Sequence, residues 1–276
     1  MLPRFDIQRP PVEPRAIVLV VHGLNLRPER MQPVCTLLLE RGAIVVRMAL
    51  RGHRGIYERL ARVRRADWLD DFTAAFDTIA EQAGHRRTEE SAPLPIGFLG
   101  QSLGALAFCD YLCSSGADSR AIDTGRGVRE ALLLSPAIAL RPRVYILRPL
   151  ITLHPRLPIP SASDPADRLY DRLPAGAYRA LFATYAAFRH SLRAAPLELP
   201  CRIVVNEGDE LVSARGISRL IETGALSAAR LVVFARSADG RGAHHLAVDP
   251  DTMGSENWER FRTEVDRFVD ALATAR

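Results

Sequence analysis

The stretch Ile96-Gly97-Phe98-Leu99-Gly100-Gln101-Ser102-Leu103-Gly104 joins a short apolar run to the pattern G-x-S-x-G. Apolar residues at helical spacing follow directly, so the stretch predicts a buried strand, a sharp turn carrying Ser102, and then a helix. Gly100 and Gly104 suit such a turn, because side chains there would collide where the strand and the helix cross. Free backbone N–H groups at the start of that helix would stabilise a developing negative charge, which indicates that Ser102 is a nucleophile.

The pattern is short and also occurs by chance, so Ser102 could instead be an ordinary residue of a strand–helix turn. A serine hydroxyl needs a base within hydrogen-bond reach and an acid that orients the base. Where the serine lies on this kind of turn, the chain order is Ser, then Asp or Glu, then His. The acid and the base are therefore expected further along the chain, in that order.

The acid predicted from that order is Asp209, which lies just after an apolar run at 201–206 that is typical of a strand. Glu207 and Glu210 compete with it. Because Gly208 places Asp209 just past the turn that ends the strand, Asp209 is preferred. Glu210 is expected to be a solvated neighbour.

Of the seven histidines in the chain, only His244 and His245 follow Asp209. They lie in a glycine-rich loop between the last predicted strand, at 231–235, and the final predicted helix, at 257–273. Both are candidates for the base, and the other ring would donate a hydrogen bond, line the pocket or face solvent. Chain order and strand-end position agree for all three groups, which favours nucleophilic catalysis over an ordinary turn.

Two backbone N–H groups are predicted to stabilise the oxyanion of such a reaction. One belongs to Leu103, directly after the serine, and the other to Leu24, in the loop after an apolar run at 16–21. Gly23 permits a turn that aims the Leu24 N–H inward. His22 is expected to be structural, with a ring that holds this loop.

Length and composition indicate a soluble globular protein. The 276 residues suffice for one large α/β domain, nearly half of them are hydrophobic, and a quarter are charged. No apolar stretch approaches the roughly 20 residues of a membrane span, and the proline-rich segment 1–14 lacks the apolar core of a signal peptide. We therefore expect a cytoplasmic protein without a transmembrane segment. Transient contact with a membrane surface and the oligomeric state are left open.

All 37 strongly basic residues are arginine, because the chain contains no lysine. This excludes Schiff-base chemistry and a Walker-type phosphate site, both of which require lysine. The densest cluster alternates with aliphatic residues and is interpreted as a solvated helix face rather than a nucleic-acid-binding surface; it comprises Arg59, Arg62, Arg64 and Arg65. The four cysteines show neither disulfide nor metal spacing, and no G-x-G-x-x-G follows a strand, so no metal or cofactor is predicted.

Apolar runs alternate with amphipathic helical runs, a pattern typical of a parallel sheet with helices on both faces. Strands are predicted at 16–21, 43–50, 96–100, 130–135, 201–206 and 231–235, and helices at 28–41, 66–83, 105–112 and 257–273. About sixty residues separate the fourth and fifth strands, far more than a crossover needs. This insertion, at about 137–198, is predicted to carry a helix over 164–192 and to lie above Ser102 as a lid that excludes water. A helical decoration away from the site is the alternative.

Several of these motifs together resemble the α/β-hydrolase superfamily, in particular its serine aminopeptidase-like and monoglyceride lipase- or lysophospholipase-like branch. They are His22-Gly23-Leu24, Leu50-Arg51-Gly52-His53-Arg54-Gly55, Gly100-Gln101-Ser102-Leu103-Gly104, Gly208-Asp209-Glu210-Leu211-Val212-Ser213 and His244-His245-Leu246. The resemblance covers about residues 15–275. It implies a single domain over 1–276 with a mostly parallel sheet. The N-terminal segment is short for the antiparallel strands that usually open such a sheet, so about six to seven strands are expected, one of them added by residues 2–8.

The resemblance also bears on the choice of base. In that branch the catalytic histidine is commonly followed by an acidic residue and Leu, with another acid three residues beyond the Leu. The frame His244-His245-Leu246-Ala247-Val248-Asp249 therefore favours His244, although His245 replaces the usual acid.

The resemblance implies a serine hydrolase that cleaves a carboxylic ester through Ser102, Asp209 and His244, with the N–H groups of Leu24 and Leu103 holding the oxyanion. The apolar insertion suggests a small-molecule ester, a lipid or another ester with an apolar acyl part. An acyltransferase with the same three residues is one alternative. A catalytically silent binding protein of the same fold is another, although such a protein would be expected to lack one of the three residues.

Overall fold

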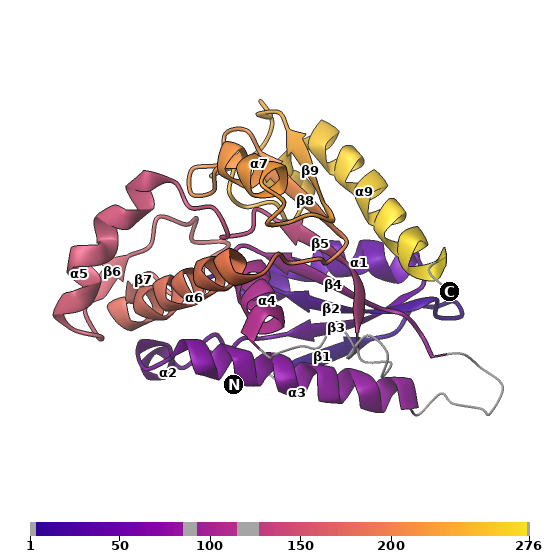
Figure 1. The fold of residues 1–276 in the computed structure, drawn as a ribbon, viewed down its shortest axis with the longest axis horizontal. Coiled ribbons are helices and arrows are strands. Elements are labelled where there is room, and N and C mark those ends of the chain that lie inside the picture. The colour runs from indigo at the N-terminus through magenta and orange to yellow at the C-terminus, as the bar shows by residue number, and fades with distance from the viewer. Residues whose placement is uncertain (1–3, 85–92, 115–126, 275–276) are drawn as a thin grey trace.

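The computed structural model describes residues 4–84, 93–114 and 127–274 (Figure 1). Its strands are β1 (Phe5–Gln8), β2 (Ala16–Val21), β3 (Ala43–Met48), β4 (Ile96–Gln101), β5 (Val128–Leu134), β6 (Pro158–Pro160), β7 (Arg172–Pro174), β8 (Cys201–Asn206) and β9 (Ala229–Phe234). The described helices are η1 (Pro28–Met31), α1 (Gln32–Glu40), α2 (Tyr57–Ala61), α3 (Arg65–Gly84), α4 (Leu103–Ser114), η3 (Pro142–Leu147), α5 (Arg148–Leu153), α6 (Ala175–Ala194), α7 (Ala214–Glu222), α8 (Pro250–Met253) and α9 (Ser255–Thr274).

The main sheet has seven strands in the order β1-β3-β2-β4-β5-β8-β9. β1 pairs antiparallel with β3, and every other neighbouring pair is parallel. A short hairpin cannot join parallel strands, so helices cross over between them. The predicted α/β fold with a mostly parallel sheet is thus confirmed. The additional strand expected within residues 2–8 is β1, and residues 2 and 3 lie outside the described part of the chain.

Helices cover both faces of the main sheet, and α3 and α9 lie on opposite sides of it in Figure 1. Alternate residues of β2 face two different cores. Ile17 and Leu19 pack into a core with α3, α4, α6 and α7, whereas Val18 and Val20 pack into a second core with α1 and α9. Burial on both faces explains why this strand forms a continuous apolar run in the sequence.

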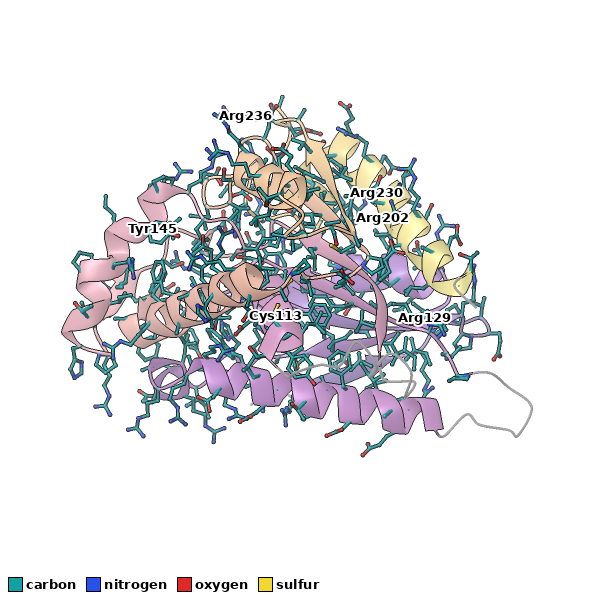
Figure 2. All side chains as sticks on the ribbon, viewed as in Figure 1. Cys113, Arg129, Tyr145, Arg202, Arg230 and Arg236 are labelled. Carbon is teal, nitrogen blue, oxygen red and sulfur yellow. The ribbon has the colours of Figure 1, made fainter. Side chains whose placement is uncertain are left out.

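The insertion between β5 and β8 leaves the sheet at the carboxyl end of β5. It contains η3, α5, the two-stranded sheet of β6 and β7, and the 20-residue helix α6. Figure 2 places Tyr145 of the insertion at one end of the molecule and Arg129, near the start of β5, at the other. The insertion therefore projects from the same edge of the sheet as the turn that follows β4, where Ser102 lies.

The helix predicted over 164–192 begins later than expected, since α6 starts at Ala175. Residues 164–171 form turns and bends that lead into β7. A tertiary contact holds this segment, because the Tyr170 N–H donates to Asn25 Oδ1 at 3.0 Å. The spacing of apolar residues predicted a helix here. The backbone of residues 164–171 instead forms hydrogen bonds with the loop after β2, which is distant in the sequence.

Candidate active site

Ser102 lies at the sharp turn between β4 and α4, with a backbone φ of 49°. This left-handed conformation is uncommon for a residue with a side chain and is typical of functional turns. The glycines on either side leave no room for a side chain. A Cβ at Gly100 would lie 2.9 Å from the Ala105 nitrogen, and one at Gly104 would lie 2.6 Å from the His22 carbonyl oxygen. The steric reason predicted for both glycines is therefore confirmed.

Ser102, His245 and Asp209 form a continuous chain of hydrogen bonds. His245 Nε2 lies 2.8 Å from Ser102 Oγ. Nδ1 of the same ring lies 3.0 Å from Asp209 Oδ2 and 3.1 Å from its Oδ1. With Asp209 ionised, Nδ1 carries the hydrogen and donates it to the carboxylate. The lone pair of Nε2 is then directed at the Ser102 hydroxyl, whose residue is only 9% exposed.

Asp209 is fully buried just beyond the end of β8. Its Oδ1 accepts the backbone N–H groups of Leu211 at 2.8 Å and Val212 at 2.7 Å. Burial by itself would raise the pKa of Asp209, but His245 and these two N–H groups outweigh it and lower the pKa below its usual value. Asp209 is therefore ionised beside His245. Glu207, the competing acid, instead accepts the Arg236 N–H at 3.2 Å.

The prediction that His244 occupies the position of the base is wrong. His245, and not His244, lies between Ser102 and Asp209. The ring of His244 packs over Gly208, where a Cβ would lie only 2.3 Å from its Cδ2. Consecutive side chains of an irregular loop project in different directions, so only one of the two rings reaches the serine.

Two side chains hold the loop that carries His245. Glu210 accepts the backbone N–H groups of His244 and His245, at 3.0 and 3.1 Å. Gln101 donates from Nε2 to the His245 carbonyl at 3.2 Å. Glu210 is half-buried rather than solvated, so the expectation for this residue is also wrong. Its position next to Asp209 is the only sign of this role in the sequence.

The loop after β2 approaches the serine turn closely. A Cβ at Gly23 would lie 3.2 Å from Ser102 Cβ and 1.8 Å from Gln101 Oε1, so glycine is the residue that fits beside the turn. The backbone N–H groups of Leu24 and Leu103 donate to no residue in the described part of the chain. Both groups are thus available at the turn, and their action as oxyanion donors stays a prediction.

Two buried histidines hold this loop. His22 Nε2 accepts the Leu50 N–H at 3.1 Å, and its Nδ1 donates to the Gly23 carbonyl at 2.7 Å. His53 Nε2 accepts the Asn25 N–H at 3.2 Å. Burial lowers the pKa of His22 to about 4 and lowers the pKa of His53 well below its usual value, so both rings are neutral. The structural role predicted for His22 is confirmed.

Residues 161–171 of the insertion lie against two loops of the site. Asn25, in the loop after β2, donates from Nδ2 to Ser161 Oγ and to the Tyr170 carbonyl, both at 2.9 Å. Arg241, in the loop that carries His245, pairs with Asp164 at 2.8 Å. The insertion therefore borders the site, and its action as a lid stays a prediction.

The sheet order and the strained serine turn are those of an α/β hydrolase, and solved structures of this class match the chain over nearly its whole length. A soluble variant of monoglyceride lipase from Saccharomyces cerevisiae has a TM-score of 0.72 at 13% identity, covering 98% of this chain and 92% of that one. Monoacylglycerol lipase from Paleococcus ferrophilus has a TM-score of 0.68 at 18% identity, with coverages of 97% and 99%. A metagenome-derived lipolytic enzyme has a TM-score of 0.69 at 17% identity, with both coverages at 98%.

The chain belongs to the serine aminopeptidase S33 family, whose sequence profile matches residues 12–179. The matched region contains the Ser102 turn and ends before Asp209 and His245. A search of the curated proteins finds no match. None of the described helices combines the length and the apolar character that a membrane span requires. Family and fold together define a serine hydrolase class without defining a substrate.

Proposed function

We propose that the protein is a serine hydrolase that cleaves carboxylic esters through Ser102, His245 and Asp209. The observation that carries this proposal is the hydrogen-bonded chain from Ser102 Oγ to His245 at 2.8 Å and from His245 to Asp209 at 3.0 Å. A base in contact with the hydroxyl, and a buried carboxylate that orients the base, are what a serine needs to act as a nucleophile. Family membership makes hydrolysis the expected overall reaction.

In the first half of the reaction, His245 Nε2 takes the hydroxyl proton while Ser102 Oγ attacks the carbonyl carbon of the ester. The electron pair of the carbonyl moves to its oxygen, which the N–H groups of Leu24 and Leu103 stabilise. Asp209 stabilises the imidazolium without taking its proton. When the intermediate collapses, the bond to the alcohol breaks, His245 protonates the leaving alcohol, and the acyl group stays on Ser102.

Water completes the cycle. His245 takes a proton from a water molecule, and the water oxygen attacks the acyl carbon, forming a second oxyanion at the same two N–H groups. The bond to Ser102 Oγ then breaks, the carboxylic acid leaves, and the proton on His245 returns to Ser102. Ester, water and these side chains account for every proton and electron pair, so the proposed reaction uses no metal or cofactor.

An apolar carboxylic ester is the substrate class that we favour. Two of the matched structures are described as monoacylglycerol or monoglyceride lipases, and this description supports an ester with an apolar acyl part. The insertion that borders the site is itself rich in apolar side chains. An apolar insertion at the border of the site agrees with an ester whose acyl part is aliphatic or aromatic.

Fluorophosphonate labelling and ester turnover test the proposal together. The wild-type protein is expected to take up the label and to hydrolyse p-nitrophenyl esters. Ser102→Ala is expected to lose labelling and to lower turnover by at least about a thousandfold. Ser218→Ala is the matched control, at a serine on α7 whose hydroxyl donates to Glu222 at 2.6 Å. Labelling of Ser102→Ala at the wild-type rate would refute the assignment of the nucleophile. Esters of increasing acyl length would then define the preferred acyl group.

A further inference from the structure

Part of the arginine cluster found in the sequence borders a cavity that is separate from the Ser102 site. The cavity has a volume of about 680 Å³. It lies between the turn that joins α2 to α3, residues 154–156 of the insertion, and the first half of α6. Figure 1 shows α2 and the start of α6 at the same end of the molecule. Neither Ser102 nor His245 lines this cavity.

Arginine side chains dominate the lining. They come from the α2–α3 turn, from the insertion and from α6, and they are Arg62, Arg64, Arg65, Arg156 and Arg179. No Asp or Glu of the described residues lines the cavity, and the remaining wall includes small apolar side chains. Positive charges that gather around an apolar concave wall focus their field and attract an anion.

Two of these guanidinium groups are held in fixed positions. Arg65 donates twice to the buried Asp110, at 2.6 and 2.9 Å. Arg179 donates from Nη2 and Nε to the Ile151 carbonyl, at 2.7 and 3.3 Å. The carbonyl fixes the Arg179 guanidinium without neutralising its charge, so Arg179 is pre-positioned for an anionic ligand.

Three guanidinium groups of the lining have no acidic partner. Within the described ranges, no carboxylate lies within 4.0 Å of Arg62, Arg156 or Arg179. His154 adds a further donor, because its Nδ1 accepts the Arg156 N–H at 3.2 Å and its hydrogen is therefore on Nε2. The cavity thus presents at least three uncompensated positive charges.

The framework of the cavity is already assembled. A Cβ at Gly176, in the first turn of α6, would lie 2.1 Å from the Ala61 carbonyl oxygen at the end of α2. The two helices therefore meet in close backbone contact, which only glycine allows. This contact sets the spacing between the arginines of the α2–α3 turn and Arg179. Because the arginines are already close together without a ligand, binding requires less ordering of the protein, and its free-energy cost is lower.

We propose that this cavity binds a phosphate-bearing molecule, with Arg62 and Arg156 contacting the phosphate from two different chain segments and Arg179 from a third. A terminal phosphate has three strong acceptor oxygens and nearly two negative charges, which match several arginine forks, whereas a carboxylate has two oxygens and one charge. The volume exceeds that of one phosphate and falls in the range of small-molecule sites, so an organic group fits as well. The phosphate can belong to a soluble molecule or to a lipid headgroup, since the contacts are the same.

Calorimetric titration with inorganic pyrophosphate tests the proposal. The wild-type protein is expected to bind, and the double variant Arg62→Gln/Arg156→Gln is expected to lose about a hundredfold in association constant. Both side chains are exposed, so the variant is expected to keep the wild-type melting temperature and turnover of a soluble ester. Arg215→Gln/Arg219→Gln removes the same charge from exposed positions on α7 and is expected to bind as the wild type does.

Two further measurements identify the source of the phosphate and test whether the cavity is independent of the Ser102 site. Co-sedimentation with phosphatidylcholine vesicles, with and without phosphatidylglycerol, tests the lipid headgroup, and the result is compared with pyrophosphate binding. If the wild-type protein binds either probe and Arg62→Gln/Arg156→Gln loses this binding, the result supports the proposal. The probe that binds then identifies the source of the phosphate. Ser102→Ala is expected to bind as the wild type does, because the cavity is separate from the proposed catalytic site. Calorimetric titration with citrate, whose negative charges are on carboxylates, tests whether the cavity selects phosphate. The proposal is overturned if neither phosphate probe binds, if the double variant binds normally, or if citrate binds as tightly as pyrophosphate.

Discussion

Glu210 accepts the backbone N–H of His245 at 3.1 Å. Its second carboxylate oxygen accepts the N–H of His244 at 3.0 Å, so one side chain fixes two consecutive peptide groups. The loop around them has no helix or strand of its own and contains Gly240 and Gly242. We infer that Glu210 is a positioning residue, which keeps the His245 ring at Ser102 without touching the reacting atoms.

Glu210→Ala is expected to lower kcat about 10- to 100-fold with little change in KM, because the His245 ring would spend less time in contact with Ser102. Steady-state kinetics with a p-nitrophenyl ester measure both constants. Glu222→Ala, which removes a surface carboxylate that bonds Ser218 at 2.6 Å, is the control. A raised KM with an unchanged kcat would show that Glu210 serves substrate binding instead.

The two neighbouring histidines are expected to behave very differently on substitution. His245→Ala removes the contact of 2.8 Å with Ser102 and should lower kcat by at least about a thousandfold. His244→Ala keeps the backbone N–H that donates to Glu210 and should change kcat by less than about threefold. Rates of fluorophosphonate labelling for both variants check the difference. A loss that is larger in His244→Ala would contradict the assignment of the base.

Substitutions of two glycines near Ser102 are expected to change different properties of the protein, stability for Gly104 and turnover for Gly23. A Cβ at residue 104 would lie 2.6 and 2.7 Å from the carbonyl oxygens of His22 and Val21, so Gly104→Ala forces backbone apart and should lower the free energy of unfolding by about 1–3 kcal/mol. A Cβ at residue 23 would instead meet the end of the Gln101 side chain, which bonds the His245 carbonyl.

Gly23→Ala is therefore expected to keep most of the stability and to lower kcat about tenfold. Urea unfolding and ester turnover, measured on both variants, test the contrast. Unchanged turnover of Gly23→Ala would show that the Gln101 side chain moves aside without disturbing His245. A loss of stability as large as that of Gly104→Ala would contradict the expected contrast between the two variants.

Stability is expected to fall in mild acid because of the buried histidines. Burial, with a smaller contribution from Arg47, lowers the pKa of His22 from 6.5 to about 4. Between these values the unfolded chain binds a proton that the folded protein excludes, so the free energy of unfolding falls as the pH drops from 6.5 towards 4. The full effect is on the order of 3 kcal/mol. Above pH 6.5, His22 makes no pH-dependent contribution.

His22→Gln is expected to flatten this dependence by about 1.4 kcal/mol per pH unit, because glutamine does not titrate. Urea unfolding at a series of pH values measures the slope. The pKa of His53 is also well below its usual value, so a smaller slope is expected to persist in the variant. An unchanged slope would mean that His22 is already protonated in the folded protein.

Local patterns in the chain were sufficient for the strands of the main sheet and for α1, α3, α4 and α9, but not for α2, α5, α7, α8 or the pair of β6 and β7. They were also sufficient to locate two of the three residues that we propose to react, Ser102 and Asp209. Strands such as β2 are buried on both faces and must therefore be continuous apolar runs, which are visible in the sequence. The turn at Ser102 depends on glycines within two residues of it, and Asp209 follows its strand directly enough to be located by chain order. These features depend on neighbours close in the chain.

Other features depend on contacts between segments that are far apart in the chain. The choice of His245 over His244 depends on Glu210 and Gln101, whose hydrogen bonds orient a loop without regular structure. The late start of α6 depends on Asn25, which bonds the segment before it. The cationic cavity appears only when Arg62, Arg156 and Arg179 are brought together by folding. Side-chain direction in an irregular loop, and the meeting of remote charges, are set by tertiary packing, so no local pattern in the sequence records them.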